Sequence, residues 1–147
     1  MWSVVALHKA IESSPGSVEM TEYLHFIIKA FETAFGGPVQ FIWSISPDLY
    51  LDAHHASYVG QIFCEAAMNA IKHGFHDGSS GHVVVTLRRV DDKSFELTVA
   101  NDGAALELKT VPPSGFHALK DLARQMNGEL HIEPMQKGVQ VRFGFTA

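Results

Sequence analysis

The sequence predicts an α/β fold, a two-layer α/β sandwich in which a mixed sheet is covered on one face by helices. Helical and strand patterns follow one another in the order α, β, α, β, β, α, β, β. The helical segments carry an apolar stripe on one side, and the strand segments alternate apolar with other residues. A chain of 147 residues suits one domain with one core, so both layers are expected in a single unit.

The first half of the chain contains the patterns of two helices and one strand. Apolar residues at three- and four-residue spacing predict a helix that starts near residues 17–21 and ends at a Gly-Gly-Pro sequence. Alternation over residues 39–45 predicts a strand, and Pro47 begins a loop. Asp52 is the expected N-cap of a long helix over residues 53–74.

The second half contains a hairpin, an irregular loop, a helix and two closing strands. They are expected, in that order, over residues 83–99, 102–114, 116–126, 130–132 and 139–145. No repeat or domain boundary interrupts these patterns. Residues 17–147 are therefore expected to form one domain, and the looser helical pattern of residues 1–16 predicts a lead-in helix.

Composition excludes several classes of function. The formal net charge is −5, with 11 Lys and Arg against 16 Asp and Glu, which argues against nonspecific nucleic-acid binding. Cys64, the single cysteine, cannot form an internal disulfide, which fits a reducing compartment. No apolar run approaches the ~20 residues that cross a bilayer, and the first residues lack the pattern of a signal peptide. We therefore expect a cytoplasmic protein or a cytoplasmic piece of one.

The long helix carries the residues with the clearest chemistry. At about 100° per residue, Glu65, Asn69 and Lys72 lie on one stripe beside the apolar face, with His73 at its edge. Glu65 can accept a proton or orient a water, and the Asn69 carbonyl oxygen suits Mg²⁺. Lys72 and His73 can contact phosphate oxygens. Taken alone, the same stripe also fits an ordinary surface helix.

Two further pieces lie downstream. Asn101 shares a strand face with the apolar residues before it and is expected to point inward, toward the helices, ahead of Gly103. Gly115 stands at a helix start, where its backbone can approach an anion. Each of these observations also has an ordinary explanation. Asn101 can simply mark the end of a strand, and Gly115 can be a plain glycine before a helix.

In this order and spacing, the pieces resemble the ATP-binding catalytic domain of bacterial sensor histidine kinases. That domain has the Bergerat fold, shared with gyrase, the Hsp90 chaperones and MutL. The likeness covers roughly residues 17–146. Residues 65–75 are similar to the family's N box, its most specific motif, and residues 122–130 to the end of its second glycine box.

The resemblance implies ATP and Mg²⁺ as cofactors and a role for each residue. Asn69 would coordinate Mg²⁺, Glu65 would act as base or water-orienter, and Lys72 and His73 would contact phosphate. Asn101 and Gly103 fall in the first glycine box, where an aspartate of the family reads the adenine amino group. Gly115 falls in the second, and residues 104–114 would form the ATP lid.

Four positions depart from the family's pattern. They are Asn101 in place of aspartate, Ala105 and His117 in place of glycines, and Val139 in place of threonine. A register with Asp102 as the base-reading residue is rejected, because that side chain would lie on the wrong strand face. Exchanging a charged for a neutral acceptor costs about 1 kcal/mol, so weakened ATP binding is expected.

Three functions remain open from the sequence. The first is transfer of the ATP γ-phosphoryl group to a histidine on a partner helical hairpin, with a response regulator or phosphoacceptor histidine domain as partner. The second is a degenerate domain that binds partners without turnover, and the third is an anti-sigma-factor serine kinase. If the chain is part of a longer protein, residues 1–16 would end a hairpin that makes a dimer.

Overall fold

The computed structural model describes residues 16–35, 39–75, 80–103 and 114–147, without the side chains of residues 73, 74, 114 and 115. The expected lead-in helix and most of the expected lid therefore lie outside the described residues. The elements are β1 (Ser17–Glu19), α2 (Met20–Phe35), β2 (Val39–Ile45), β3 (Tyr50–Asp52), α3 (Ala53–Gly74), β4 (Gly81–Arg89), β5 (Ser94–Asn101), α4 (Ser114–Gln125), β6 (Glu129–Pro134) and β7 (Val139–Thr146).

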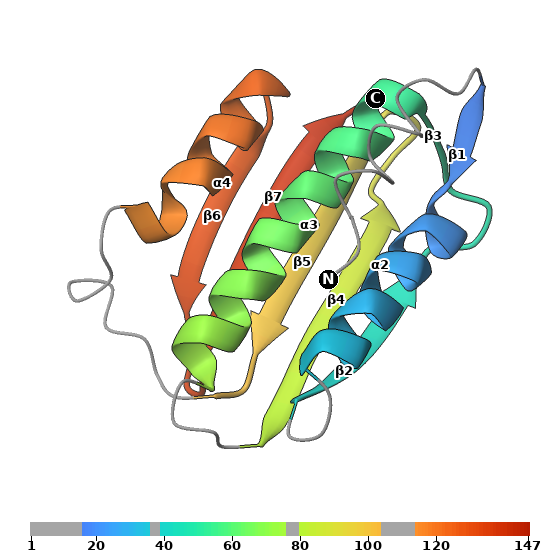
Figure 1. Cartoon of the computed structure of the whole chain (residues 1–147). Helices are drawn as coiled ribbons and strands as arrows, with labels where there is room; N and C mark the ends of the chain where they lie inside the picture. Colours follow the sequence, from blue (N-terminus) through green and yellow to red (C-terminus); the bar gives the residue numbers. More distant parts are fainter. Residues whose placement is uncertain (1–15, 36–38, 76–79, 104–113) are drawn as a thin grey trace.

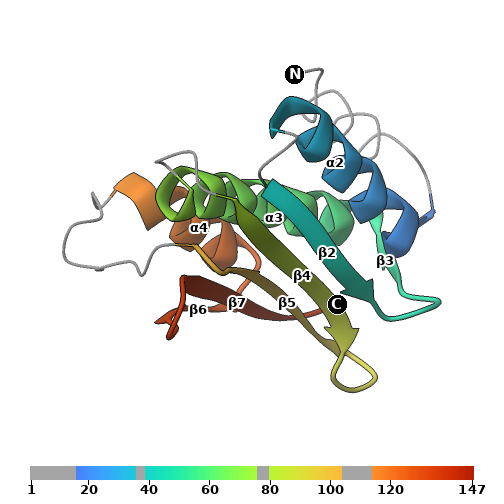
Figure 2. The same cartoon turned by 90° about the horizontal axis from the view of Figure 1, so that it is seen from below.

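One mixed sheet forms the lower layer of the sandwich. Its strand order is β2-β4-β5-β7-β6; the neighbours β2 and β4 run parallel, and the other three neighbouring pairs run antiparallel. The three helices α2, α3 and α4 lie on the same face of this sheet (Figures 1 and 2). The predicted two-layer α/β sandwich is confirmed, and the eight predicted elements of the domain occur in the predicted order.

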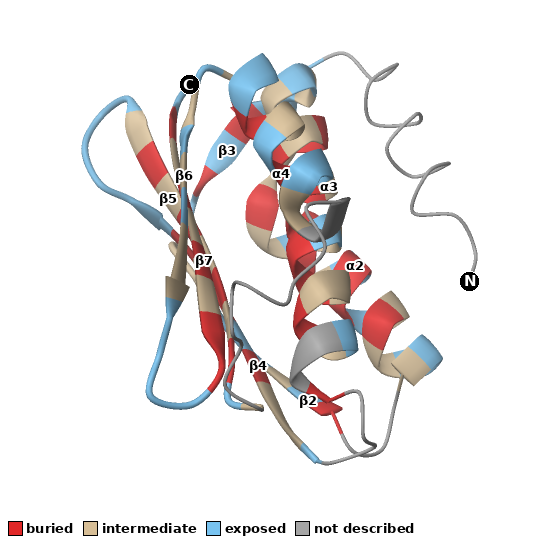
Figure 3. Cartoon of the chain, turned by 90° about the vertical axis from the view of Figure 1, so that its left-hand side faces the viewer, coloured by how far each residue is buried: buried red, intermediate tan, exposed pale blue. Residues whose placement is uncertain are grey.

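Helix α3 lies along the middle of the sheet, between α2 and α4 (Figure 1). The predicted N-cap is confirmed: the side chain of Asp52 accepts a hydrogen bond of 2.9 Å from the His55 N–H. The buried face of α3 includes Val59, Ile62 and Phe63, which pack in one core with the inward residues of β4, β5 and β7. Buried residues accordingly line the space between helices and sheet (Figure 3).

The short ribbon of β1 and β3 was not predicted. Residues 50–52, expected in a loop, pair antiparallel with residues 17–19. Three-residue strands are too short to show alternation, so no local pattern reveals them. The ribbon defines where α2 begins, because the Glu19 carboxylate accepts hydrogen bonds from the Thr21 and Glu22 N–H groups at the start of that helix.

No helix in the described ranges is both long enough and apolar enough to cross a membrane.

Helices α2 and α3 approach each other closely at Gly60. A Cβ built at Gly60 would overlap the hydroxyl of Tyr23 and lie 2.7 Å from the ring carbon that carries it. Both residues are buried. A glycine in the interior of a helix costs about 1 kcal/mol relative to alanine, so the close packing of Tyr23 offsets an unfavourable local choice.

Substitution Gly60→Ala is expected to lower the free energy of unfolding by about 2 kcal/mol, because the added methyl overpacks the contact with Tyr23. Helix propensity alone predicts the opposite sign. Urea unfolding followed by circular dichroism measures the difference.

The matched control is Gly144→Ala in β7, where an added Cβ meets only a backbone oxygen of Phe95 at 4.0 Å. This variant should unfold at the same urea concentration as the wild type or at a higher one. A Gly60→Ala protein more stable than the wild type would contradict the packing argument.

Candidate nucleotide-binding site

The C-terminal half of α3 presents the polar stripe that the sequence predicts. Glu65 and Lys72 are exposed and Asn69 is half-buried, while Ala66 and Ala70 between them are buried in the core. The stripe therefore borders the buried face of α3, where a site wall can form. His73 belongs to the same helix, but its side chain lies outside the described part of the chain.

Asn101 ends β5 on the buried face of the sheet, as predicted, with 8% of the residue exposed. Its Oδ1 accepts a hydrogen bond of 3.0 Å from the Gly103 N–H, and its Nδ2 donates to the Val139 carbonyl at 3.5 Å. These two partners orient the amide. An amide group has two acceptor lone pairs and two N–H donors, so these two bonds use one of each.

Gly138 provides the space that Asn101 occupies. Its φ is +81°, a left-handed conformation that favours glycine. A Cβ at this position would overlap both the backbone oxygen and the Oδ1 of Asn101. Gly138 lies in the turn between β6 and β7. Its contact with Asn101 depends on the pairing of β5 with β7, which no local pattern shows.

Asp102 lies on the opposite side of the strand from Asn101 and is exposed. Its Oδ1 accepts a hydrogen bond of 2.6 Å from the His82 N–H, and its Oδ2 lies 2.9 Å from Nδ1 of the His82 ring. Asp102 also donates its own N–H to the His82 carbonyl at 3.2 Å. The structure thus supports the rejection of Asp102 as the inward-facing residue, and it adds a pair that the sequence did not reveal.

Helix α4 begins at Ser114, so Gly115 belongs to its first turn. His117, one of the departures from the family's pattern, points away from the core and is highly exposed. Its Nε2 lies 3.3 Å from the Asp121 carboxylate, one helical turn farther along. The His117 ring therefore lies on the solvent-exposed side of α4.

Three of these segments lie at one end of the molecule. The C-terminal end of α3, the end of β5 and the start of β4 lie at the lower end of the view in Figure 1, whereas α4 begins at mid-height on the left-hand side and packs against α3. Asn69, Lys72, Asn101 and Gly103 thus belong to segments that end there, and Gly115 belongs to the start of the helix beside α3.

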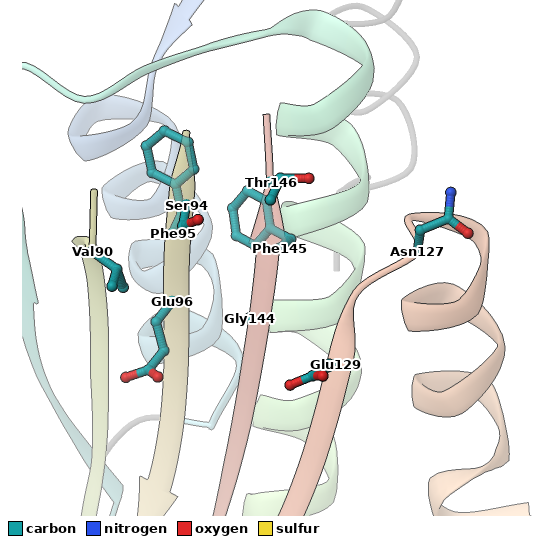
Figure 4. A pocket seen from close by; sticks show the side chains of 9 residues that line it. All are labelled: Val90, Ser94, Phe95, Glu96, Asn127, Glu129, Gly144, Phe145 and Thr146. Carbon is teal, nitrogen blue, oxygen red and sulfur yellow. The ribbon is translucent and has the colours of Figure 1, made fainter. Parts of the chain in front are cut away.

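A surface recess of about 340 Å³ lies at the other end of β5 and is a different feature. It is lined by Val90, Ser94, Phe95, Glu96, Asn127, Glu129, Gly144, Phe145 and Thr146 (Figure 4). Glu96 and Glu129 flank Gly144 in the strand register. Two carboxylates at a recess repel phosphate groups, so this recess does not suit a nucleotide triphosphate.

Cys64 precedes Glu65 on α3 and is half-buried. Burial, together with the nearby charge of Glu65, raises the pKa of the Cys64 thiol to about 12. A thiol with so high a pKa is a poor nucleophile. Cys64 instead packs against the core as a partly buried residue.

Comparison with known proteins identifies the class. A family model of the histidine kinase-like ATPase domain matches residues 44–132, and the chain belongs to this family. The matched segment includes α3, β5 and α4, which carry the candidate site residues.

Individual relatives agree with this assignment. The nitrate/nitrite sensor protein NarX of Escherichia coli (strain K12) is 27% identical over 110 residues, which cover 74% of this chain and 17% of NarX. The sensor protein NarQ homolog of Haemophilus influenzae is 30% identical over 95 residues, which cover 63% of this chain and 16% of that protein. The chain therefore spans less than a fifth of the length of these relatives.

The fold agrees with a solved histidine kinase domain, that of the blue-light activated histidine kinase EL346 from Erythrobacter litoralis. The TM-score is 0.80 at 20% identity, over 95% of this chain and 68% of that one.

The pKa of Asp102 leads to a prediction about acid stability. Desolvation of its carboxyl raises the pKa, but the hydrogen bonds and the charge of His82 lower it further, so the net shift is downward. A lowered pKa in the folded chain stabilises the fold above the ordinary aspartate pKa, and this contribution is lost as the pH falls through the folded-state value. Asp102→Asn should therefore lower the urea midpoint at pH 7 and lower it less at pH 3.

The control for this comparison is Asp92→Asn, an exposed side chain in the turn between β4 and β5. Its effect on the urea midpoint should be small at both pH values. An Asp102→Asn effect that is equally large at pH 3 would show that the carboxylate charge is not the cause.

Proposed function

We propose that this chain is the ATP-binding catalytic domain of a two-component sensor histidine kinase. It would transfer the γ-phosphoryl group of ATP to a histidine on a partner helical hairpin. The observation that carries the proposal is that the stripe of Glu65, Asn69 and Lys72 runs toward the same end of the molecule as the buried Asn101, on a helix that packs against both β5 and α4. The comparisons with sensor proteins support the same reading.

The residues at the phosphate end fit Mg²⁺ and a triphosphate in their chemistry. The Asn69 side chain offers a hard oxygen, and Glu65 is a carboxylate one turn away. Lys72 supplies an exposed positive charge, and Gly115 places a backbone N–H in the first turn of α4, where anions bind well. His73 is proposed as a further phosphate contact, on the same helix.

The proposed mechanism rests on positioning. Bound Mg²⁺ would neutralise charge that develops on the phosphates during transfer. Asn69 would hold the metal, and Lys72, His73 and the α4 N–H groups would hold the phosphate oxygens in line with the acceptor. Glu65 would accept the acceptor's proton or orient it. Such positioning supplies most of the catalysis expected for phosphoryl transfer.

The proposed contact with the adenine base is weaker than the phosphate contacts. Asn101 would accept the adenine amino proton through the remaining lone pair of Oδ1, while its Nδ2 stays with the Val139 carbonyl. Gly103 donates its N–H to the same Oδ1 and so leaves less of that oxygen for the base. We infer that ATP binds more weakly than to a site with an aspartate.

The proposed setting follows from the class. The partners would be a phosphoacceptor histidine domain and a response regulator, and the domain would act in the cytoplasm. A hairpin preceding residue 17 would supply the dimer. The two alternatives, a partner-binding module without turnover and an anti-sigma-factor serine kinase, are not favoured by the comparisons.

Calorimetric titration with a nonhydrolysable ATP analogue, with and without Mg²⁺, tests the proposal directly. Binding that Mg²⁺ strengthens is expected. Absence of binding at millimolar analogue would overturn the proposed function. With radiolabelled ATP and a phosphoacceptor hairpin, the product should be an acid-labile phosphohistidine, whereas an acid-stable phosphoserine would favour the serine kinase.

Asn69→Ala should abolish the Mg²⁺ dependence of analogue binding, because the variant lacks the amide oxygen that would hold the metal. The matched control is Gln61→Ala, an amide on the same helix that donates to the Ser57 hydroxyl at 3.2 Å. The control should keep the wild-type Mg²⁺ dependence. An unchanged dependence in Asn69→Ala would refute the metal assignment.

Asn101→Asp should tighten analogue binding roughly five-fold, because a charged acceptor gains about 1 kcal/mol over a neutral one. The same change should lower the stability of the free protein, since a carboxylate would face the Val139 carbonyl. Titration and urea unfolding measure the two effects. Asn127→Asp, the same exchange in the turn after α4, should leave the affinity unchanged, and weaker binding by Asn101→Asp would contradict the assigned base contact.

A further inference from the structure

The two edges of the sheet differ in chemistry. The edge strand β6 carries Glu129, Glu133 and Pro134. Charged side chains and proline at an edge hinder pairing with another strand. The other edge strand, β2, has the sequence Val-Gln-Phe-Ile-Trp-Ser-Ile, with no charged residue and no proline. One edge is therefore protected against association and the other is not.

The unprotected edge is accessible. All seven residues of β2 pair with β4 on one side, and within the described ranges no strand pairs with the other side. Ile42 is 52% exposed and Trp43 39% exposed, which is unusual for large apolar side chains in a strand. The His25 ring lies 5.1 Å from the Trp43 ring and fixes it on the helix side of the strand.

The sequence of β2 is complementary to itself when read in the opposite direction. About Ile42 as centre, every residue opposes one of its own kind: β-branched with β-branched, polar with polar, aromatic with aromatic. The opposed pairs are Val39 with Ile45, Gln40 with Ser44, Phe41 with Trp43, and Ile42 with itself. Such like pairs stabilise antiparallel strands, and the absence of charge means that no like charges meet.

We propose that β2 pairs antiparallel with the β2 of a second copy of this chain, with the two-fold axis at Ile42. The pairing joins two five-stranded sheets edge to edge and satisfies the outward N–H and C=O groups of both β2 strands. A two-fold contact of this kind uses the same surface on both copies. The assembly stops at two copies, because the remaining edges are the protected β6 strands. The pairing uses none of the residues assigned to the nucleotide, and the proposal stands independently of the proposed function.

Single-cysteine variants test both the partner and the register. Directly opposed residues of antiparallel strands have Cα atoms about 4.5–5.5 Å apart, within disulfide range. Ile42→Cys should therefore form a disulfide-linked dimer on mild oxidation. Gln40→Cys and Ser44→Cys should each stay unlinked when alone, because four residues of offset separate equivalent positions by about 14 Å. A mixture of these two variants should link.

Each outcome of this experiment supports or overturns the proposed pairing of β2 with a second β2. No dimer from Ile42→Cys, or dimers from Gln40→Cys and Ser44→Cys alone, overturns the proposal, since the latter pattern indicates a parallel pairing or random collision. The unsubstituted chain, with Cys64 as its one thiol, is the control and should not link.

Sedimentation equilibrium of the unsubstituted chain supplies a second test. A monomer–dimer equilibrium at micromolar concentrations is expected, and Ile42→Lys should weaken it at least ten-fold by placing two like charges opposite each other. The matched change on the protected edge, His131→Lys, should leave it unchanged. If the unsubstituted chain stays monomeric, the β2 edge does not bind a second copy. If Ile42→Lys and His131→Lys weaken the dimer equally, the contact lies elsewhere on the chain. Either result overturns the proposal.

Discussion

Packing of α3 along the middle of the sheet is the constraint on which the other features depend. Val59, Ile62, Phe63, Ala66 and Ala70 are all buried, and their spacing leaves one orientation of the helix about its axis. That orientation places the stripe of Glu65, Asn69 and Lys72 at the border of the buried face. A rotation that moved the stripe would expose the core residues, so the same apolar contacts that stabilise the fold also position the polar side chains.

The two ends of the sheet carry different polar groups. At one end the carboxyl end of β5 brings Asn101 beside Gly138, at the same end of the molecule as the C-terminal end of α3. At the other end Glu96 and Glu129 flank a glycine in a surface recess. Since negative charge disfavours phosphate, the proposed triphosphate site lies at the end away from these two carboxylates.

The departure from the family's pattern at residue 101 is matched by a backbone contact of the side chain, with the carbonyl of residue 139. The Asn101 amide donates to the Val139 carbonyl, whereas a carboxylate would face that carbonyl oxygen without a proton to share. Asparagine is thus the residue better suited to the free protein, and aspartate the residue better suited to an amino group of a base. In the proposed site, residue 101 would therefore affect the stability of the fold and the strength of base binding in opposite directions.

Local periodicity was enough to predict α2, α3, α4, the five sheet strands, the Asp52 cap and the inward face of Asn101, because helical and strand repeats are properties of neighbouring residues. The β1–β3 ribbon, the overlap between Gly138 and Asn101, the pair of His82 and Asp102, and the edge position of β2 could not be predicted in this way. Each depends on which distant strands pair. The alternation in β2 resembles that of an interior strand, and only the assembled sheet leaves one of its sides open.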